Sequence, residues 1–252
     1  MPGPFFGELL GGVSSFKFME VMMTIIWSEI KEEESSAELS TVMKLYDQSF
    51  PIEVREPHEI FHRSIKYSRE RYPNNFRFLI GKEDDQLVSF ATGHYLADVN
   101  AGFIVYIVAN PLARNSGLGS KTLVKIEELL NKDAHSAGHS SLRAIFLETE
   151  TQDLVHSEQE KADCERRNRF FDKNSYEKYD EITYLQPPLH NGMDEVPLNL
   201  FIKNLQKDEL MKQEIQNAIQ AIYREKYLVV NNINKDVINH CLKKMGIDEL
   251  PN

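Results

Sequence analysis

The sequence predicts a mixed α/β domain followed by a helical tail. Strand-like and helix-like segments alternate along most of the 252 residues, a pattern typical of a sheet covered by helices. The run Phe103–Ala109 (FIVYIVA) is apolar throughout, which predicts a central strand covered on both faces. From Lys207 onward the apolar residues recur at helical spacing. These three observations favour one domain with a helical appendix.

The first half of the chain predicts one strand, two helices and a hairpin. Leu39, Val42 and Tyr46 follow helical spacing, and Pro57 suits the first turn of a second helix. A polar turn at 83–86 separates two strand-like runs, as in a hairpin. The expected elements are a strand at Thr24–Ile30, helices at Leu39–Phe50 and Pro57–Arg71, and strands at Phe76–Gly81 and Leu87–Tyr95.

The second half predicts the remaining strands and helices. Leu123, Ile126 and Leu130 form the apolar stripe of a helix that follows the central strand. Next come a strand at Arg143–Thr149, a helix at Glu158–Lys173, and strands at Tyr179–Tyr184 and Val196–Phe201. We expect residues 1–23 to form an N-terminal arm, 24–203 the α/β domain and 204–252 a helical extension.

The charge balance of the chain is acidic and excludes several classes of protein. It has 29 Lys and Arg against 39 Asp and Glu, a formal net charge of −10. A nucleic-acid-binding face needs a basic stripe, and none is present. The first residues lack the roughly 18 uninterrupted apolar residues of a membrane span. Only Cys164 and Cys241 could pair, which suits a reducing compartment. We expect a cytoplasmic protein that binds neither nucleic acid nor membranes.

The loop Arg114–Ser120 (RNSGLGS) precedes the helix that follows the central strand. A helix start exposes unpaired backbone N–H groups at the positive end of the helix dipole. Gly117 and Gly119 lack Cβ atoms, so a phosphate could approach the backbone closely. A plain strand-to-helix turn explains the same residues equally well. The P-loop and dinucleotide motifs are excluded because other residues stand where they need glycine: Asn115, Ser120 and Thr122.

Four segments together resemble the GNAT superfamily of N-acyltransferases. The loop has the R-x-x-G-x-G pattern of the acyl-CoA pyrophosphate loop in that family. The matching segments, in the family's order, are Tyr46–Pro57, Phe103–Ser120, Phe146–Glu150 and Asn168–Leu189. The resemblance spans roughly residues 24–201. It implies the GNAT fold, a central and mostly antiparallel sheet of six to seven strands with flanking helices, plus the C-terminal helical extension.

The resemblance also implies where acetyl-CoA, or another acyl-CoA, would bind. In the family, the fourth and fifth strands splay apart and the pantetheine arm bonds to the edge of the fourth strand. Backbone amides of the loop then bind the pyrophosphate, and Asn168 either bonds the cofactor arm or orients a turn. The implied cofactor-binding residues are Ile107, Val108, Ala109, Arg114, Asn115, Ser116, Gly117, Gly119, Ser120, Asn168 and Phe171.

The implied reaction is direct attack of a primary amine on the thioester, which requires a base. A free alkyl amine has a pKa of about 10, so its proton must be removed. The central strand has no Glu, and the nearest carboxylates are Glu148 and Glu150, which share one strand face. We choose Glu148 as the base. An equally good interpretation is that one of these two carboxylates has a structural role and hydrogen-bonds to neighbouring backbone.

The general acid departs from the family pattern. A Tyr of the family's F-Y-x-x-x-G-F motif often protonates the leaving thiolate, and Phe171 stands at that position here. Tyr106 and Tyr176 are the candidate substitutes, although a buried Tyr is more often a packing residue. The thiolate could also leave unassisted. This departure keeps a second function open, that of a non-catalytic acyl-CoA-binding or sensor module.

A third function rests on the segment His58–His62, which reads H-E-x-x-H. On a helix the two imidazoles share a face and can bind zinc, as in zinc peptidases. Pro57 places the motif in a first helical turn, however, and no convincing third ligand follows. We therefore expect no metal. The expected partners are a small-molecule or peptide amine acceptor and a second copy of the chain in a homodimer.

Overall fold

The computed structural model describes residues 24–31, 36–110, 117–152, 155 and 157–251. The expected N-terminal arm, and Arg114, Asn115 and Ser116 of the predicted pyrophosphate loop, lie outside the described residues. One eight-stranded sheet runs through the molecule in the order β1-β2-β3-β4-β5-β8-β6, with β7 also paired to β8. The strands are β1 Ile26–Glu29, β2 Asn75–Glu83, β3 Gln86–Leu96, β4 Ala101–Ala109, β5 Ala144–Glu150, β6 Glu177–Lys178, β7 Tyr184–Gln186 and β8 Val196–Asn204.

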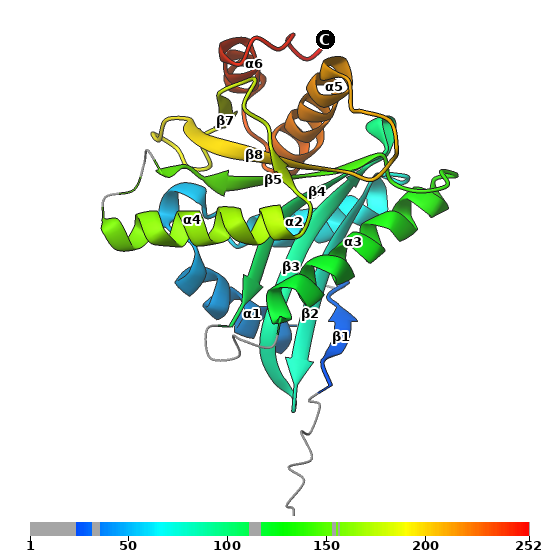
Figure 1. Cartoon of the computed structure of the whole chain (residues 1–252), viewed down its shortest axis with the longest axis vertical. Helices are drawn as coiled ribbons and strands as arrows, with labels where there is room; N and C mark the ends of the chain where they lie inside the picture. Colours follow the sequence, from blue (N-terminus) through cyan, green and yellow to red (C-terminus); the bar gives the residue numbers. More distant parts are fainter. Residues whose placement is uncertain (1–23, 32–35, 111–116, 153–154, 156, 252) are drawn as a thin grey trace, which may run out of the picture.

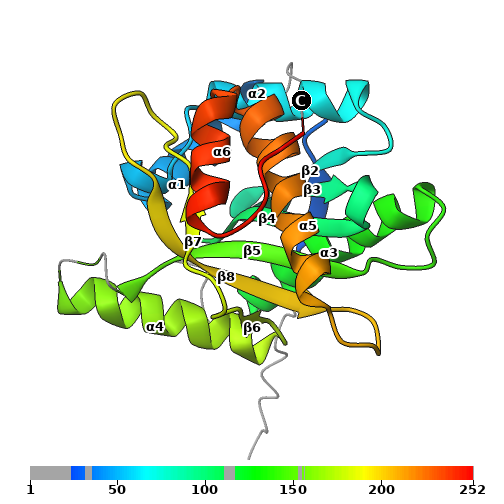
Figure 2. The same ribbon diagram turned by 90° about the horizontal axis from the view of Figure 1, so that it is seen from above.

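Helices cover both faces of this sheet (Figures 1 and 2). The apolar residues of α3 and Phe171 of α4 share one core cluster with inward-facing residues of β2 to β5 and β8. The opposite face is covered by α1 and α2 over one half and by the C-terminal helices over the other. The helices are α1 Ser36–Ser49, α2 Glu59–Glu70, α3 Leu118–Ser136, α4 Glu158–Lys173, α5 Lys212–Ile222, the π-helix η5 Tyr223–Val230 and α6 Lys235–Lys244.

Most predicted elements are present, and the differences have local causes. The β2–β3 hairpin turns at Asp84 and Asp85, whose φ angles of 47° and 60° suit a two-residue turn with the twist of the strands. The predicted strand at Tyr179–Tyr184 is wrong. Two short strands, β6 and β7, pair with β8 on either side of the exposed Asp180 and Glu181 instead. This division gives eight strands rather than six to seven.

The strands β4 and β5 diverge partway along their length. They pair in parallel only from Ala101–Ala144 to Ile104–Leu147. Across β3 and β4 the register steps from Thr92–Tyr106 to Gly93–Ile104, so Val105 is an extra residue on β4. Such a bulge bends the strand that carries it. Beyond it, β5 continues in pairing with β8, and a gap opens between β4 and β5.

Candidate active site

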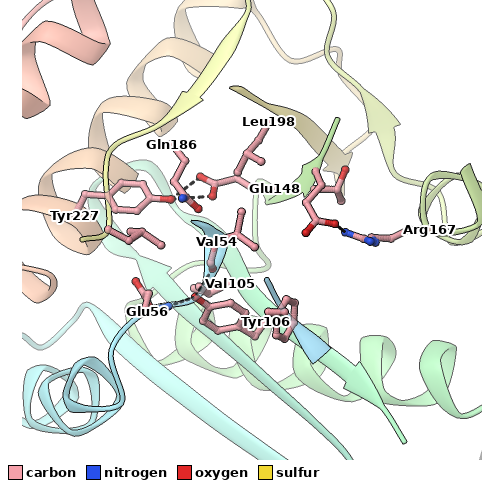
Figure 3. Close-up of a pocket in the computed structure, with 13 residues that line it drawn as sticks. Val54, Glu56, Val105, Tyr106, Glu148, Arg167, Gln186, Leu198 and Tyr227 are labelled. Carbon is pink, nitrogen blue, oxygen red and sulfur yellow. Dashed lines mark hydrogen bonds and ion pairs between the residues drawn. The ribbon is translucent and has the colours of Figure 1, made fainter. Parts of the chain in front are cut away.

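A narrow pocket lies beside the point where β4 and β5 separate (Figure 3). Its cavity volume is about 50 Å³, more than one water occupies and small enough to enclose only the reacting end of a substrate. Three carboxylates line it, from the segment before α2 and from β5, together with one guanidinium from α4. The lining residues are Phe50, Val54, Glu56, Val105, Tyr106, Glu148, Thr149, Glu150, Arg167, Gln186, Leu189, Leu198 and Tyr227.

Glu148 occupies the centre of this pocket wall, held by two tyrosines. The Tyr227 hydroxyl donates to Oε1 at 2.9 Å and to Oε2 at 2.8 Å. The Tyr184 hydroxyl also donates to Oε1. Strand alternation points Glu148 to the side of the sheet that α5 and η5 cover, the side that Phe146 also faces. Two neutral donors do not compensate the negative charge of the ionised carboxylate. Its remaining lone pairs can still accept a hydrogen bond or a proton from another group.

The environment of Glu148 brings its pKa close to neutrality. Burial raises the pKa of Glu148 to about 7, and the hydrogen bonds from Tyr184 and Tyr227 oppose that increase. The same burial raises the pKa of both tyrosines well above 10, so they remain neutral donors. A base works best when its pKa lies near the working pH. Glu148 therefore has the proton affinity that a general base needs.

Glu56 faces the pocket from the opposite wall and is neutralised by a buried lysine. Lys226 Nζ lies 2.8 Å from Oε1 and 2.9 Å from Oε2 of Glu56. The Asn231 amide donates to Oε1 at 2.6 Å. The side chains of Glu56 and Lys226 are 3% and 2% exposed, so this ion pair is removed from water.

The third carboxylate, Glu150, lines the pocket and forms an ion pair with Arg167 of α4. Arg167 lies at one side of the pocket (Figure 3). Between this pair and Glu148, Thr149 donates to Asn168 Oδ1 at 3.4 Å. The Asn199 amide in turn donates to Thr149 at 3.3 Å and to the Glu150 carbonyl at 3.0 Å. Asn168 thus lies beside the end of β5 and is part of a polar network that orients this strand.

The structure brings only one of the two candidate acid tyrosines to the pocket. Tyr106 lines it, donates to the Val54 carbonyl at 3.0 Å and accepts from the Glu56 backbone N–H at 3.3 Å. Tyr176 instead belongs to the core cluster on the opposite sheet face, and its hydroxyl donates to Glu127 at 2.7 Å. Tyr176 and Glu148 therefore do not share a site.

The described part of the predicted acyl-CoA site lies at the diverging end of β4 and at the start of α3. Ile107, Val108 and Ala109 follow the bulge on β4, beyond its pairing with β5. Gly117 precedes α3 with a φ of 70°, a left-handed conformation that glycine adopts without strain, and a Cβ there would meet open space. Ser120 is half-buried in the first turn of α3.

Gly119 has a packing role that its motif does not suggest. A Cβ at Gly119 would lie 3.1 Å from the ring of Phe170 on α4. Packing between two helices is thus sufficient reason for a glycine at this position. Phe171, which the sequence placed beside the cofactor, is 3% exposed and packs against Tyr176 and Phe201 in the core. Phe170 is the aromatic residue that lies against the start of α3.

The H-E-x-x-H segment does not assemble a metal site within the described part of the chain. His58 is the N-cap of α2, and its Nε2 lies 2.9 Å from Asp47 Oδ1. Among the residues that the structure describes, no three His, Cys, Asp or Glu side chains are grouped as metal ligands. The described helices also include none that is long and apolar enough to cross a membrane.

Sequence reasoning missed the two tyrosines that bind Glu148. Tyr184 was expected at the end of a strand, and Tyr227 lay unremarked within the helical tail. The only signal was the concentration of tyrosines in these segments, and nothing in their spacing linked them to β5. Their proximity depends on how β7 and η5 pack across the sheet, which local sequence patterns do not encode.

Comparisons with known proteins agree with this architecture. Residues 39–154 match the model of the acetyltransferase (GNAT) family. A comparison with curated proteins gave no match. A GNAT-family acetyltransferase of Bacteroides thetaiotaomicron superposes with a TM-score of 0.58 at 21% identity, covering 83% of this chain and 99% of that one.

Two similar solved structures are complexes with coenzyme A or acetyl-CoA. The PaiA N-acetyltransferase of Thermoplasma acidophilum, in complex with coenzyme A, has a TM-score of 0.46 at 16% identity and covers 72% of this chain and 99% of its own. An acetyltransferase of Salmonella typhimurium with acetyl-CoA has a TM-score of 0.47 at 11% identity, with coverages of 75% and 98%. Residues 39–154 of this chain therefore match the GNAT family of acetyltransferases, and the chain has the fold of that family.

Proposed function

We propose that the protein transfers an acetyl group from acetyl-CoA to a primary amine, with Glu148 as the general base. The observation that carries this proposal is the Glu148 carboxylate, enclosed beside the diverging strands with a pKa of about 7. Bound acetyl-CoA would supply a thioester carbon activated toward nucleophiles. Glu148 would accept the proton of the amine as its nitrogen bonds to that carbon, and the C–S electron pair would leave with sulfur as the thiolate.

The residues present fit an acyl-CoA at the gap between β4 and β5. The edge of β4 from the bulge to Ala109 is free of β5 and can bond to an extended amide-containing chain. The start of α3 offers backbone N–H groups and a helix dipole for a diphosphate. Gly117 leaves open space there. Backbone donors near Val108 would stabilise the oxyanion of the tetrahedral intermediate.

The pocket favours an acceptor with a cationic amine on an apolar stem. Glu56, Glu148 and Glu150 make its wall acidic, which attracts an ammonium group. Phe50, Val54, Leu189 and Leu198 add apolar surface around these carboxylates. A small alkyl amine or a lysine side chain has this chemistry. We retain Tyr106 as the candidate acid for the thiolate because its hydroxyl lies in the pocket wall.

The two cysteines bear on the compartment in which the protein works. Cys164 and Cys241 are both buried free thiols, which supports a reducing cytoplasm. A homodimer stays a prediction.

A thiol-release assay tests the proposed function. The protein would be incubated with acetyl-CoA and a panel of primary amines, and free coenzyme A measured with a thiol reagent. We expect release that depends on the amine and an acetylated amine product by mass spectrometry. Binding of acetyl-CoA, seen as a raised melting temperature, without acetylation of any amine would contradict the proposal and favour the sensor function.

A further inference from the structure

The three carboxylates of the pocket differ in whether a cation compensates their charge. Glu150 is paired with Arg167, and Glu56 with Lys226. Glu148 has only the tyrosines Tyr184 and Tyr227 as hydrogen-bond partners in the described structure. An incoming ammonium group therefore meets one carboxylate whose charge is uncompensated. The pairing, rather than position alone, determines which carboxylate can take the proton.

Lys226 reaches Glu56 because of an unusual helix. The segment Tyr223–Val230 is an eight-residue π-helix, and its wider turn is confirmed by the bond from Asn231 N–H to the Lys226 carbonyl at 2.9 Å. The adjacent residues Lys226 and Tyr227 are both directed into the protein, at 1% and 2% exposure. One contacts Glu56 and the other Glu148. π-helical turns occur frequently at functional sites.

We propose that Lys226 is a positioning residue of the acetyl transfer, which neutralises Glu56 and thereby leaves Glu148 as the proton acceptor of the pocket. This inference rests on the proposed function. Glu148 of β5 and Glu56 of the segment before α2 line the same pocket (Figure 3). Burial strengthens the neutralisation of Glu56 by Lys226, because water does not screen charges that it cannot reach.

The charges around Glu148 determine the sign of the expected effects. Negative Glu56 raises the pKa of Glu148, and positive Lys226 lowers it. The other groups that face the site are Tyr184 of β7, Tyr223 and Tyr227 of η5, Tyr106 of β4, and the Glu150–Arg167 pair of β5 and α4. Removing Lys226 therefore raises the pKa of Glu148, and removing the charge of Glu56 lowers it.

Two variants with opposite effects test the inference in the full chain. In Lys226→Met the acidic limb of the kcat/KM profile should move to higher pH by about one unit, and in Glu56→Gln to lower pH by a similar amount. The KM for acetyl-CoA should change little, because neither side chain lies on β4 or α3. Arg77→Met is the matched control, since Arg77 forms a half-buried ion pair with Asp133 on the other face of the sheet.

Loss of one partner of a buried pair often destabilises a protein, so a third variant is needed. Asn231→Asp adds a charge beside Glu56 from a half-buried residue, and it should also move the limb to higher pH. Unchanged limbs in the folded, active variants would overturn the inference, as would equal shifts in Arg77→Met. A wild-type protein that acetylates no amine would instead refute the proposed function, so the two failures are distinguishable.

Discussion

The hydroxyl of Tyr227 bridges both carboxylate oxygens of Glu148, at 2.9 Å to Oε1 and 2.8 Å to Oε2. Tyr227 belongs to the C-terminal helical segment, and Glu148 to the central sheet. The helical extension is therefore part of the pocket in which we place the reaction. Ile215 and Ile222 of α5 also share a core cluster with Phe103 and Phe146 of the sheet, so the extension is held firmly against β4 and β5.

Replacement of Glu148 tests its role as the base. Glu148→Gln keeps the shape of the side chain but cannot accept the amine proton, and we expect kcat/KM to fall by about 10²- to 10³-fold. The affinity for acetyl-CoA, measured by calorimetry, should stay within about twofold because the proposed acetyl-CoA site lies on β4 and α3.

Glu150→Gln is the matched control for this substitution. Glu150 lies two residues along the same strand and already pairs with Arg167, so we expect a fall of less than about tenfold. A larger loss in Glu150→Gln than in Glu148→Gln would exchange the assignments of the two residues.

The pH dependence follows from the raised pKa of Glu148. The carboxyl group is protonated below about pH 7 and cannot act as a base, so kcat/KM should fall about tenfold per pH unit on the acidic side. Tyr227→Phe removes hydrogen bonds that lower this pKa. The acidic limb of the kcat/KM profile should therefore move to higher pH by up to about one unit. Rate profiles from about pH 5.5 to about pH 9 measure both effects. A limb that stays in place in Tyr227→Phe would show that the bridge does not affect the base.

Glu148 should also limit stability at neutral and alkaline pH. Its pKa is about 7 in the folded protein and 4.5 in the reference state, so the folded protein binds the proton more tightly. Stability of the wild type is therefore lost as pH rises from about 4.5 toward about 7 and above. Glu148→Gln does not titrate and should melt at a higher temperature than the wild type at about pH 8, whereas the difference should disappear below about pH 4.5. Scanning calorimetry at both pH values checks the sign, and a less stable variant at about pH 8 would contradict it.

A pair of substitutions at Gly117 tests the diphosphate site. Asn and Asp both tolerate the left-handed conformation that Gly117 adopts, and a Cβ there meets open space. Gly117→Asp adds a negative charge near the expected diphosphate, so we expect it to bind coenzyme A about tenfold more weakly than Gly117→Asn. Calorimetric titration of both variants is the measurement. Equal affinities would show that the start of α3 is not part of the binding site. Gly119 is a poorer position for this test because its substitution would disturb Phe170.

The sequence by itself determined the order of elements and most of their bounds. Glu158–Lys173 coincides with α4, because its capping box and charged, helix-favouring composition are local properties. The predicted strand Phe103–Ala109 lies within β4, Ala101–Ala109, because its unbroken apolar run requires cover on both faces. Glu148 and Glu150 could also be selected from sequence, since strand alternation places both on one face.

Only the tertiary structure decided what surrounds those carboxylates. The bulge at Val105 separates β4 from β5, and β7 and η5 bring Tyr184 and Tyr227 to Glu148 from 36 and 79 residues away. Which carboxylate is paired and which is free depends on these long-range contacts. Local periodicity reports how a segment folds and which face it buries, but a pKa depends on desolvation and neighbouring charges in space, which exist only once the sheet and its helices have packed.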